Sequence, residues 1–335
     1  MKRDVNLDIL RVISCVAVVG LHSFQENLAS LNLVVYRLCS FAIPMFFLVS
    51  GYLLIHRDVT IRYSLNKILK ISVVVLLWNF LIWFVISIKN LIFNGVPIDV
   101  MSLLVSVWQG FVQQGRFWHF WYLFALMIVY LLLPVLSKYL NQCSGKRALL
   151  IWGTCAVIGI TLQGLSEFVY HYSLQSHIIQ SLRIWTWVQY FIFGGLFYRF
   201  RDKWHMKYKK WVCVAVVLLS IGIVIYQACA YNWINSFYGE LFYDSAVTII
   251  WTGSIFVFVM NLSVNDWFGR LIGIMAPCTM GIYIIHPLLI RYIKRVFYPY
   301  TFLSSLVYFL VLLFGSFVIT YIIKKIPIVK RLVNL

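Results

Sequence analysis

The stretch LDILRVISCVAVVGLHSFQ at residues 7–25 decides the fold of this chain. It is apolar over nearly the length that a helix needs to cross a bilayer, about 20 residues, yet it contains Asp8, Arg11 and His22. Ionisable side chains are costly in hydrocarbon, so such residues are functional candidates by default. Eleven helical steps return the chain to within roughly 20° of its starting direction and displace it by roughly 16 Å. Arg11 and His22 are therefore expected on one helix face, at different depths.

The rest of the chain has the same apolar character. Of its 335 residues, 62% are hydrophobic and 11% are charged, and the mean hydropathy is +0.89. This leaves too little polar surface to cover a soluble domain. The apolar runs are long and lack the alternation of barrel strands, which predicts an all-α, polytopic bundle of about ten transmembrane helices. Residues 1–335 are expected to form a single integral-membrane domain with no appended soluble domain. The expected spans are 7–25, 33–55, 70–92, 118–137, 148–165, 183–199, 211–230, 244–262, 271–290 and 302–323.

The net charge of +18 follows this topology. With a cytoplasmic N-terminus, most of the 28 Lys and Arg residues fall on the cytoplasmic side, as the positive-inside rule requires. Both termini are therefore expected in the cytoplasm, and the expected partner is the lipid bilayer rather than nucleic acid. Arg291, Lys294 and Arg295 break the pattern, so either the span 271–290 is misplaced or these cations face an anionic ligand at the outer leaflet. The seven cysteines show no C-x-x-C spacing, and no metal site is predicted.

His22 is a candidate catalytic base or nucleophile. Glu26 follows it by one helical turn, where a carboxylate can orient the imidazole and raise its basicity. The plainer explanation is a histidine satisfied by a neighbouring carbonyl group. Asp8 likewise offers a plainer role for Arg11, because a carboxylate three residues away can simply neutralise it.

Two kinds of loop are expected. The inner loop 56–70 mixes apolar and basic residues, which is typical of a segment at the membrane interface. Its cations are Arg57, Arg62, Lys67 and Lys70. The outer loops 93–117, 164–182 and 231–243 are poor in Lys and Arg and rich in aromatic residues. Such loops suit a sugar ligand, although an interfacial aromatic belt is the plainer explanation.

Three further segments combine polar and aromatic side chains. They are PMFFLVSGYLL at 44–54, WHFWYL at 118–123 and GIYIIHPL at 281–288. The spacing of residues within each segment is, by itself, weak evidence for a functional site. Ser50 and Gly51 can serve only close helix packing, and Pro287 can serve only to kink a helix.

Read with the first stretch, these segments resemble the acyltransferase-3 family of integral-membrane acyltransferases, in particular its surface-polysaccharide O-acetyltransferase branch. Arg11 and His22 are similar to the family's signature of Arg or Lys, ten residues, then His. The other three segments resemble its patterns FF-x-x-SG-[FY], H-L-W-F-L and G-I-Y-L-x-H-P. The family often has R-x-x-R after the second helix, where this chain has Lys67 and Lys70, and lysine lacks the bidentate geometry of arginine. The substrate-binding residues implied by the resemblance are Ser50, His119, Trp121, Tyr122, Tyr283 and His286.

The resemblance implies an acyl-CoA donor, normally acetyl-CoA, and no permanently bound cofactor. The implied acceptor is a hydroxyl of an outward-facing cell-surface glycan or its lipid-linked saccharide precursor, at the cell membrane of a bacterium. The cations of the inner loop would hold the donor phosphates, and Arg11 would hold the donor or polarise its carbonyl. His22, assisted by Glu26, would either take the acyl group or deprotonate the sugar hydroxyl, and the sequence leaves both routes open.

Two alternatives remain. A transporter or flippase for a lipid-linked glycan also uses intramembrane ionisable residues, but it predicts internal repeats or paired broken helices, and no convincing repeat is present. An acyltransferase acting on a membrane lipid, an amino acid or a peptidoglycan precursor would keep the chemistry and change only the acceptor.

Overall fold

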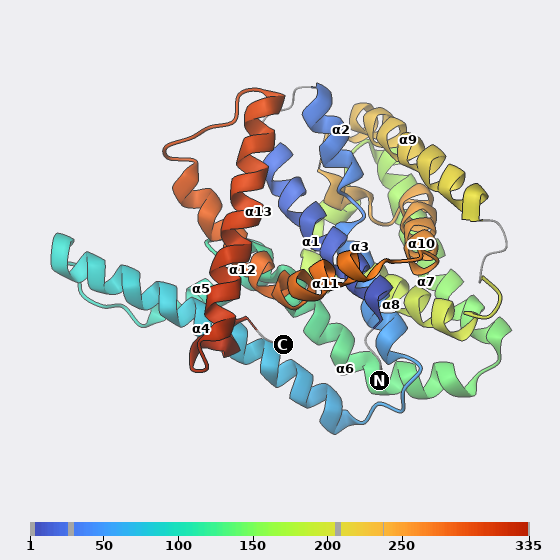
Figure 1. Cartoon of the computed structure of the whole chain (residues 1–335), viewed down its shortest axis with the longest axis horizontal. Helices are drawn as coiled ribbons and strands as arrows, with labels where there is room; N and C mark the ends of the chain where they lie inside the picture. The colour runs from blue at the N-terminus through green and yellow to red at the C-terminus, as the bar shows by residue number, and fades with distance from the viewer. Residues whose placement is uncertain (1–3, 26–29, 205–208, 237, 334–335) are drawn as a thin grey trace.

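The computed structural model describes residues 4–25, 30–204, 209–236 and 238–333, and these residues form helices and turns without a strand (Figure 1). In these ranges, eight helical segments are long and apolar enough to cross a membrane. The predicted all-α, polytopic bundle is therefore confirmed. The helices are α1 Val5–Phe24, α2 Ser30–Leu38, α3 Ala42–Leu54, α4 Ile61–Asn94, α5 Met101–Phe111, α6 Trp121–Gln142, α7 Gly145–Leu165, α8 Ile184–Arg199, α9 Lys209–Ile234, α10 Ala246–Met260, α11 Asp266–Met275, α12 Thr279–Ile293 and α13 Phe302–Lys325.

α1 lies inside the bundle. It contacts α2, α3, α10, α11, α12 and α13, and most of its side chains are buried. Its first turn is capped by Asp4, whose carboxylate accepts hydrogen bonds from the backbone N–H groups of Asn6 at 3.0 Å and Leu7 at 3.4 Å. The helix that carries the two ionisable residues is thus fixed by packing on several sides and by a cap at its start.

α3 and α8 form the most extensive helix contact in the described structure. A Cβ atom on Gly51 would lie 1.8 Å from the backbone oxygen of Phe191, and one on Gly194 would lie 1.9 Å from that of Leu48. Only glycine allows two backbones to approach this closely. The packing interpretation of the Ser50-Gly51 pair is therefore confirmed for Gly51.

Two expected spans are short helices. α8 has 16 residues and α10 has 15, fewer than the ~20 that a helix needs to cross the hydrocarbon core. Both are largely buried, α8 against α3, α6 and α7 and α10 against α9. Their places are therefore set by contacts with longer helices.

The expected span 271–290 lies within the apolar helical segment Asp266–Ile293, but this segment is not one continuous α-helix. The chain instead forms α11, a 3₁₀ turn over Ala276–Cys278, and then α12. Pro277 lies in this turn, where it cannot donate a backbone hydrogen bond to the preceding helix. Figure 1 shows α11 lying across the direction of α13, so the chain changes direction before it enters α12.

Two expected loops are also helical. Residues 61–70 of the inner loop are the first turns of α4, which begins after Thr60, whose side chain accepts a hydrogen bond from the N–H of Tyr63 at 3.2 Å. The outer loop 93–117 contains α5, which folds back on α4. Figure 1 shows the α4–α5 pair projecting from the side of the bundle.

Candidate active site

Three histidines from distant parts of the chain meet inside the bundle. His22 lies in the last turn of α1, His119 in the 3₁₀ turn Trp118–Phe120, and His286 in α12. The ring centroids of His22 and His286 are 5.4 Å apart, with their planes inclined by 17°. Those of His119 and His286 are 6.3 Å apart. The structure therefore brings together the three histidines that the sequence motifs contain.

The ring of His286 is fixed by its own helix. Its Nδ1 lies 2.8 Å from the backbone oxygen of Ile282. A carbonyl oxygen only accepts, so Nδ1 donates the hydrogen and Nε2 of the neutral ring carries the lone pair. Within the described residues, Nε2 is buried and has no hydrogen-bond partner. An acceptor atom is thus held in the interior beside the ring of His22.

Aromatic side chains enclose this cluster. Trp118 meets His22 edge-on, with ring centroids 4.8 Å apart and planes at 88°. Tyr283 packs on His119 with centroids 5.3 Å apart, and its hydroxyl donates a hydrogen bond to the backbone oxygen of His119. Tyr283 precedes His286 by one turn of α12, so this bond ties α12 to the turn that carries His119.

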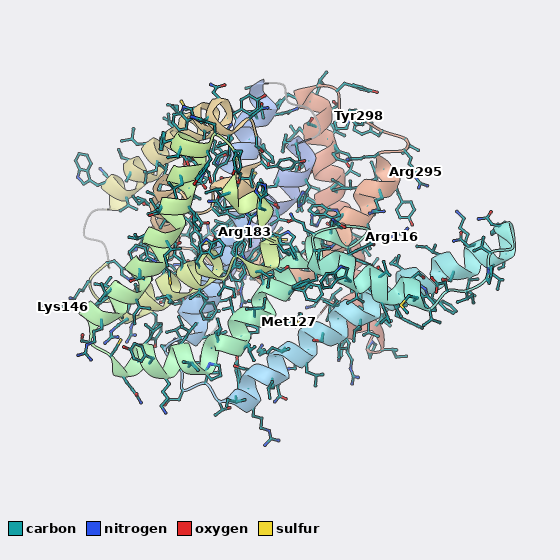
Figure 2. All side chains as sticks on the ribbon, turned by 180° about the vertical axis from the view of Figure 1, so that it is seen from behind. Arg116, Met127, Lys146, Arg183, Arg295 and Tyr298 are labelled. Atoms are coloured by element: carbon teal, nitrogen blue, oxygen red, sulfur yellow. The ribbon has the colours of Figure 1, made fainter. Side chains whose placement is uncertain are left out.

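His22 also lines a cavity of about 590 Å³, which we call the outer cavity after the predicted orientation of the chain. Burial raises the pKa of the Glu240 carboxyl, against the opposing effects of Gln113, which donates a hydrogen bond to it at 2.8 Å, and of Arg183. Burial lowers the pKa of Arg183, which Figure 2 labels near the middle of the molecule. The wall of the outer cavity includes Gln25, Tyr36, Gln113, Trp118, Arg183, Glu240 and Lys294.

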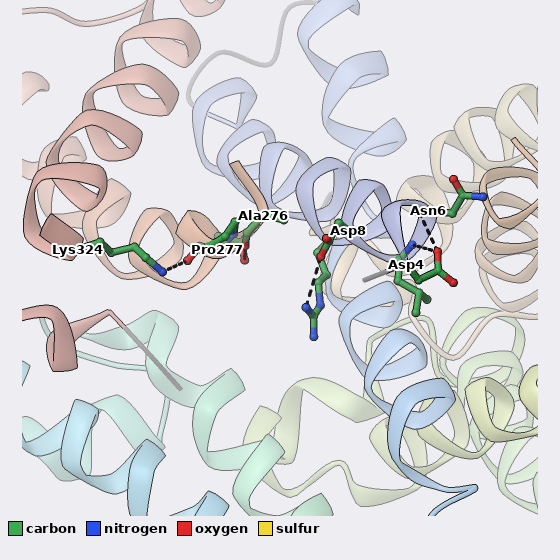
Figure 3. Close-up of polar contacts among 9 residues, drawn as sticks. Asp4, Asn6, Asp8, Ala276, Pro277 and Lys324 are labelled. Atoms are coloured by element: carbon green, nitrogen blue, oxygen red, sulfur yellow. Dashed lines mark hydrogen bonds and ion pairs between the residues drawn. The ribbon is translucent and has the colours of Figure 1, made fainter. Parts of the chain in front are cut away.

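Arg11 lines a second cavity, of about 330 Å³, which we call the inner cavity. The guanidinium of Arg11 pairs with Asp8 at 3.7 Å, and the Arg11 side chain stays 44% exposed. Lys324 Nζ donates a hydrogen bond to the backbone oxygen of Pro277 at 2.8 Å (Figure 3). The wall also includes Ser50, Lys67, Tyr122 and Tyr283. Three cations, those of Arg11, Lys67 and Lys324, therefore line one cavity.

The histidine cluster lies between these two cavities. On α1, Arg11 lines the inner cavity and His22 the outer one, and eleven residues of helix separate them by roughly 16 Å. On α12, Tyr283 lines the inner cavity and Ile290 the outer one, with His286 between them in the helix. A molecule in each cavity would approach the cluster from opposite sides.

The basic residues expected to hold a donor are not all in one place. Lys67 lines the inner cavity. Arg62 and Lys70 are exposed on α4, and Arg57 is half-buried before that helix begins, so these three are not part of the wall of the inner cavity. The physical reason is that 61–70 is helical, which turns successive cations to different sides of α4.

Two other expected site residues are not at the cluster. Trp121 packs in the core against Trp187, with ring centroids 5.2 Å apart, and it lines neither cavity. Its neighbour Trp118 lines the outer cavity instead. Glu26 lies outside the described residues.

Sequence reasoning did not select Arg183, Glu240 or Lys324, which line the two cavities. Arg183 and Glu240 are charged residues in outer segments that are otherwise poor in Lys and Arg, and that was the available signal. Lys324 belongs to the basic end of the last span, where a solvated lysine is the default expectation, so nothing in the sequence marked it.

Comparisons with known proteins agree with the motifs. The family model described as an acyltransferase domain matches residues 4–325. An Enterococcus faecalis protein named amino-acid racemase is 25% identical over 353 residues, which cover 96% of this chain and 46% of that protein. The chain thus spans about half the length of this relative. No solved structure matches. On the match over residues 4–325, the chain belongs to the acyltransferase-3 family.

Proposed function

We propose that the protein is an O-acetyltransferase that moves an acetyl group from cytoplasmic acetyl-CoA to a hydroxyl of an outward-facing cell-surface glycan or its lipid-linked precursor. The observation that carries the proposal is the position of His22, His119 and His286 between two cavities that lie along α1 on opposite sides of the cluster. The proposed location is the plasma or inner membrane of a bacterial cell.

The inner cavity supports the proposed donor. Its wall carries Arg11, Lys67 and Lys324, and cations attract the phosphates of a CoA-type donor electrostatically. Ser50 and Tyr122 line the same cavity and offer hydroxyl groups to the amides of an extended arm. In this arrangement the thioester approaches the cluster from the side of Tyr283.

The outer cavity supports the proposed acceptor. It holds amide and hydroxyl side chains such as those of Gln113, Gln180 and Tyr36, beside the aromatic ring of Trp118. Sugars offer both hydroxyl groups and apolar ring faces, and such a wall can contact both. His22 lies in this wall, so a bound hydroxyl can reach its imidazole.

Two chemical routes fit this geometry. In direct transfer, His22 takes the proton of the hydroxyl, the oxygen attacks the thioester carbonyl, and the departing thiolate receives a proton from the imidazolium. In the covalent route, His22 attacks the thioester and forms an acyl-imidazole, while its ring proton goes to the departing thiolate. The hydroxyl then attacks the acyl group and gives its proton to the released imidazole. In both routes a C–S bond breaks, a C–O bond forms, and free CoA leaves as the thiol.

The test is transfer of label from radioactive acetyl-CoA supplied to the cytoplasmic face of sealed inverted vesicles. We expect lumenal glycan to be labelled by the wild type and not by His22→Ala. His177→Ala is the matched control, because His177 is an exposed histidine that lines neither cavity, and this variant should retain full transfer. Label trapped on wild-type protein and absent from His22→Ala would select the covalent route.

Other outcomes would contradict the proposal. Full transfer by a folded His22→Ala variant would remove the assigned catalytic role. If the wild type left acetyl-CoA intact with an acceptor-rich lumen, other acyl donors and the transporter hypothesis would come next. Transfer to a lipid, an amino acid or a peptidoglycan precursor would preserve the chemistry and replace the acceptor.

A further inference from the structure

A third cavity, of about 500 Å³, lies at the α4–α5 pair and is called the side pocket here. Its wall comes from α4, residues 96–99, α5, residues 115–116 and the end of α12. Figure 2 labels Arg116 where this helix pair meets the rest of the molecule. The side chains used below are those of Trp83, Asp99, Arg116 and Arg291.

The side pocket carries an excess of positive charge. Arg116 and Arg291 both line it and are close enough to repel each other. Among the described residues, neither forms an ion pair. Asp99 also lines the pocket, but its carboxylate oxygens accept hydrogen bonds from the backbone N–H groups of Met101 at 2.9 Å and Ser102 at 3.2 Å. The one carboxylate in the wall is therefore engaged at the start of α5.

The pocket is also ordered by hydrogen bonds. Nη2 of Arg291 donates to the backbone oxygen of Gly115 at 2.8 Å, which uses one of its five donors and holds the guanidinium at the wall. The indole of Trp83 donates to the backbone oxygen of Asp99 at 3.0 Å and to Oγ of Ser102 at 2.9 Å. A fixed aromatic ring beside two guanidinium groups suits a ligand that has both an apolar ring face and a negative charge.

The side pocket adjoins the outer cavity. Arg116 lines the pocket, while Gln113 and Trp118 of the same segment line the outer cavity. On α12, Arg291 lines the pocket and Lys294 the outer cavity. Two short segments thus form a shared wall, so neighbouring units of one chain-like ligand can occupy both spaces.

We propose that the side pocket binds the carboxylate or phosphate of an acidic acceptor saccharide, while a neighbouring unit of that saccharide enters the outer cavity. The proposal rests on the acyltransferase function proposed above and assigns its acceptor to the anionic class. Arg116 and Arg291 bind the negative group by charge-assisted hydrogen bonds, which relieves the repulsion between them. A phospholipid headgroup offers the same chemistry, so the test separates the two sources.

The test measures binding to the purified full-length protein in phosphatidylcholine nanodiscs. The probes are a hexagalacturonate and a phosphorylated mannose pentasaccharide, each paired with its uncharged counterpart. We expect the wild type to bind at least one acidic probe roughly 10- to 100-fold more tightly than the neutral one, as for charged hydrogen bonds. The double variant Arg116→Gln, Arg291→Gln should lose this preference. Arg295→Gln is the matched control, because Arg295 belongs to the same basic end and does not line the pocket.

The outcomes are separable. Equal binding of charged and neutral probes, or an unchanged preference in the double variant, would overturn the proposal, provided that the thermal unfolding of this variant matches that of the wild type. If Arg116 and Arg291 retained phosphatidylglycerol and the protein showed no preference for charged saccharides, the side pocket would be a lipid site. That result would also overturn the proposal. His22→Ala should lose transfer and keep the charge preference, so charge-dependent binding without any wild-type transfer would refute only the proposed function.

Discussion

At the scale of single residues, Nε2 of His286 distinguishes this cluster from a set of satisfied core histidines, as do both ring nitrogens of His119, which are buried without a hydrogen-bond partner among the described residues. Nδ1 of His286 is engaged by Ile282, whereas Nε2 is buried and has no partner among the described residues. A buried acceptor without a partner costs free energy, ~1–3 kcal/mol. Such an atom is retained where a substrate or a neighbouring group supplies the missing donor, and here the nearest stacked ring is that of His22.

Two substitutions distinguish the roles of the two nitrogen atoms of the His286 ring. In His286→Asn the side-chain amide can still donate to the backbone oxygen of Ile282, but nothing remains at the position of Nε2. In His286→Gln an amide group reaches that position. We expect kcat to fall by roughly 100-fold in His286→Asn and by less in His286→Gln, with KM for acetyl-CoA unchanged because His286 does not line the inner cavity. Wild-type kcat in His286→Asn would show that Nε2 has no part in transfer.

Glu240 gives a pH prediction. Burial raises the pKa of its carboxyl above the ordinary value of 4.5. The folded state then holds the proton more tightly than the unfolded state, so the stability it contributes is complete at acid pH and is lost as pH rises through the raised pKa. Glu240→Gln cannot ionise, so it removes the loss of stability at high pH. Its side chain keeps an oxygen that can accept the hydrogen bond from Gln113.

Thermal unfolding of the two proteins in detergent tests this prediction. At about pH 8, Glu240→Gln should be more stable than the wild type by about 1 kcal/mol, the order of cost for burying one polar group. At about pH 5 the difference should shrink, because the wild-type carboxyl begins to be protonated. A difference that stays constant with pH would mean that Glu240 is not the titrating group.

At the scale of helices, the contact between α3 and α8 positions Ser50 in the wall of the inner cavity. Gly51→Ala would bring a methyl group to 1.8 Å from the backbone oxygen of Phe191. A backbone atom cannot move aside by rotation, as the end of a flexible side chain can. The two helices must separate, so we expect a loss of ~1–3 kcal/mol, the usual cost of overpacking, together with lower activity.

A second glycine provides the control for this prediction. Gly222 lies within α9, and an added Cβ there would meet nothing within 4 Å. Gly222→Ala should therefore keep full activity and be more stable by up to ~1 kcal/mol, because alanine has the higher helix propensity. Equal stability of the Ala variants at positions 51 and 222 would contradict the close contact between α3 and α8.

The sequence predicted the helices whose signals are local and missed those that depend on packing. Hydropathy and length were sufficient for α1 and α6. The break at Pro277 was missed because apolar residues continue on both sides of it. α5 was missed because its exposed apolar residues also fit an aromatic outer loop.

The same contrast holds for the candidate site. His22, His119 and His286 were selected by their motifs, and the structure places them together. Trp121 was selected in place of Trp118, because a 3₁₀ turn changes which side chains face a cavity and no periodic pattern marks so short a turn. Only tertiary packing decides which of two neighbouring tryptophans lines the outer cavity.

At the scale of the whole molecule, the helix bundle contains one cavity on each side of the histidine cluster. Substrates confined to different sides of a membrane can react only if each side has its own access to the same side chains. The predicted orientation assigns Lys324 to the cytoplasmic side and Gln25 to the outside, and these residues line different cavities. The two cavities are therefore expected to react with water-soluble reagents from opposite sides.

Cysteine labelling tests this expectation. In a background with the seven native cysteines replaced, Gln25→Cys should react with a membrane-impermeant maleimide added to intact cells, and Lys324→Cys should not. In inverted vesicles the order should reverse, because only the cytoplasmic face is then exposed to the reagent. The exposed loop position 99 is a reference for the outer side, as Asp99→Cys should follow Gln25→Cys. If Gln25→Cys and Lys324→Cys reacted from the same side, both cavities would open to one compartment, and transfer across the membrane would have no structural basis.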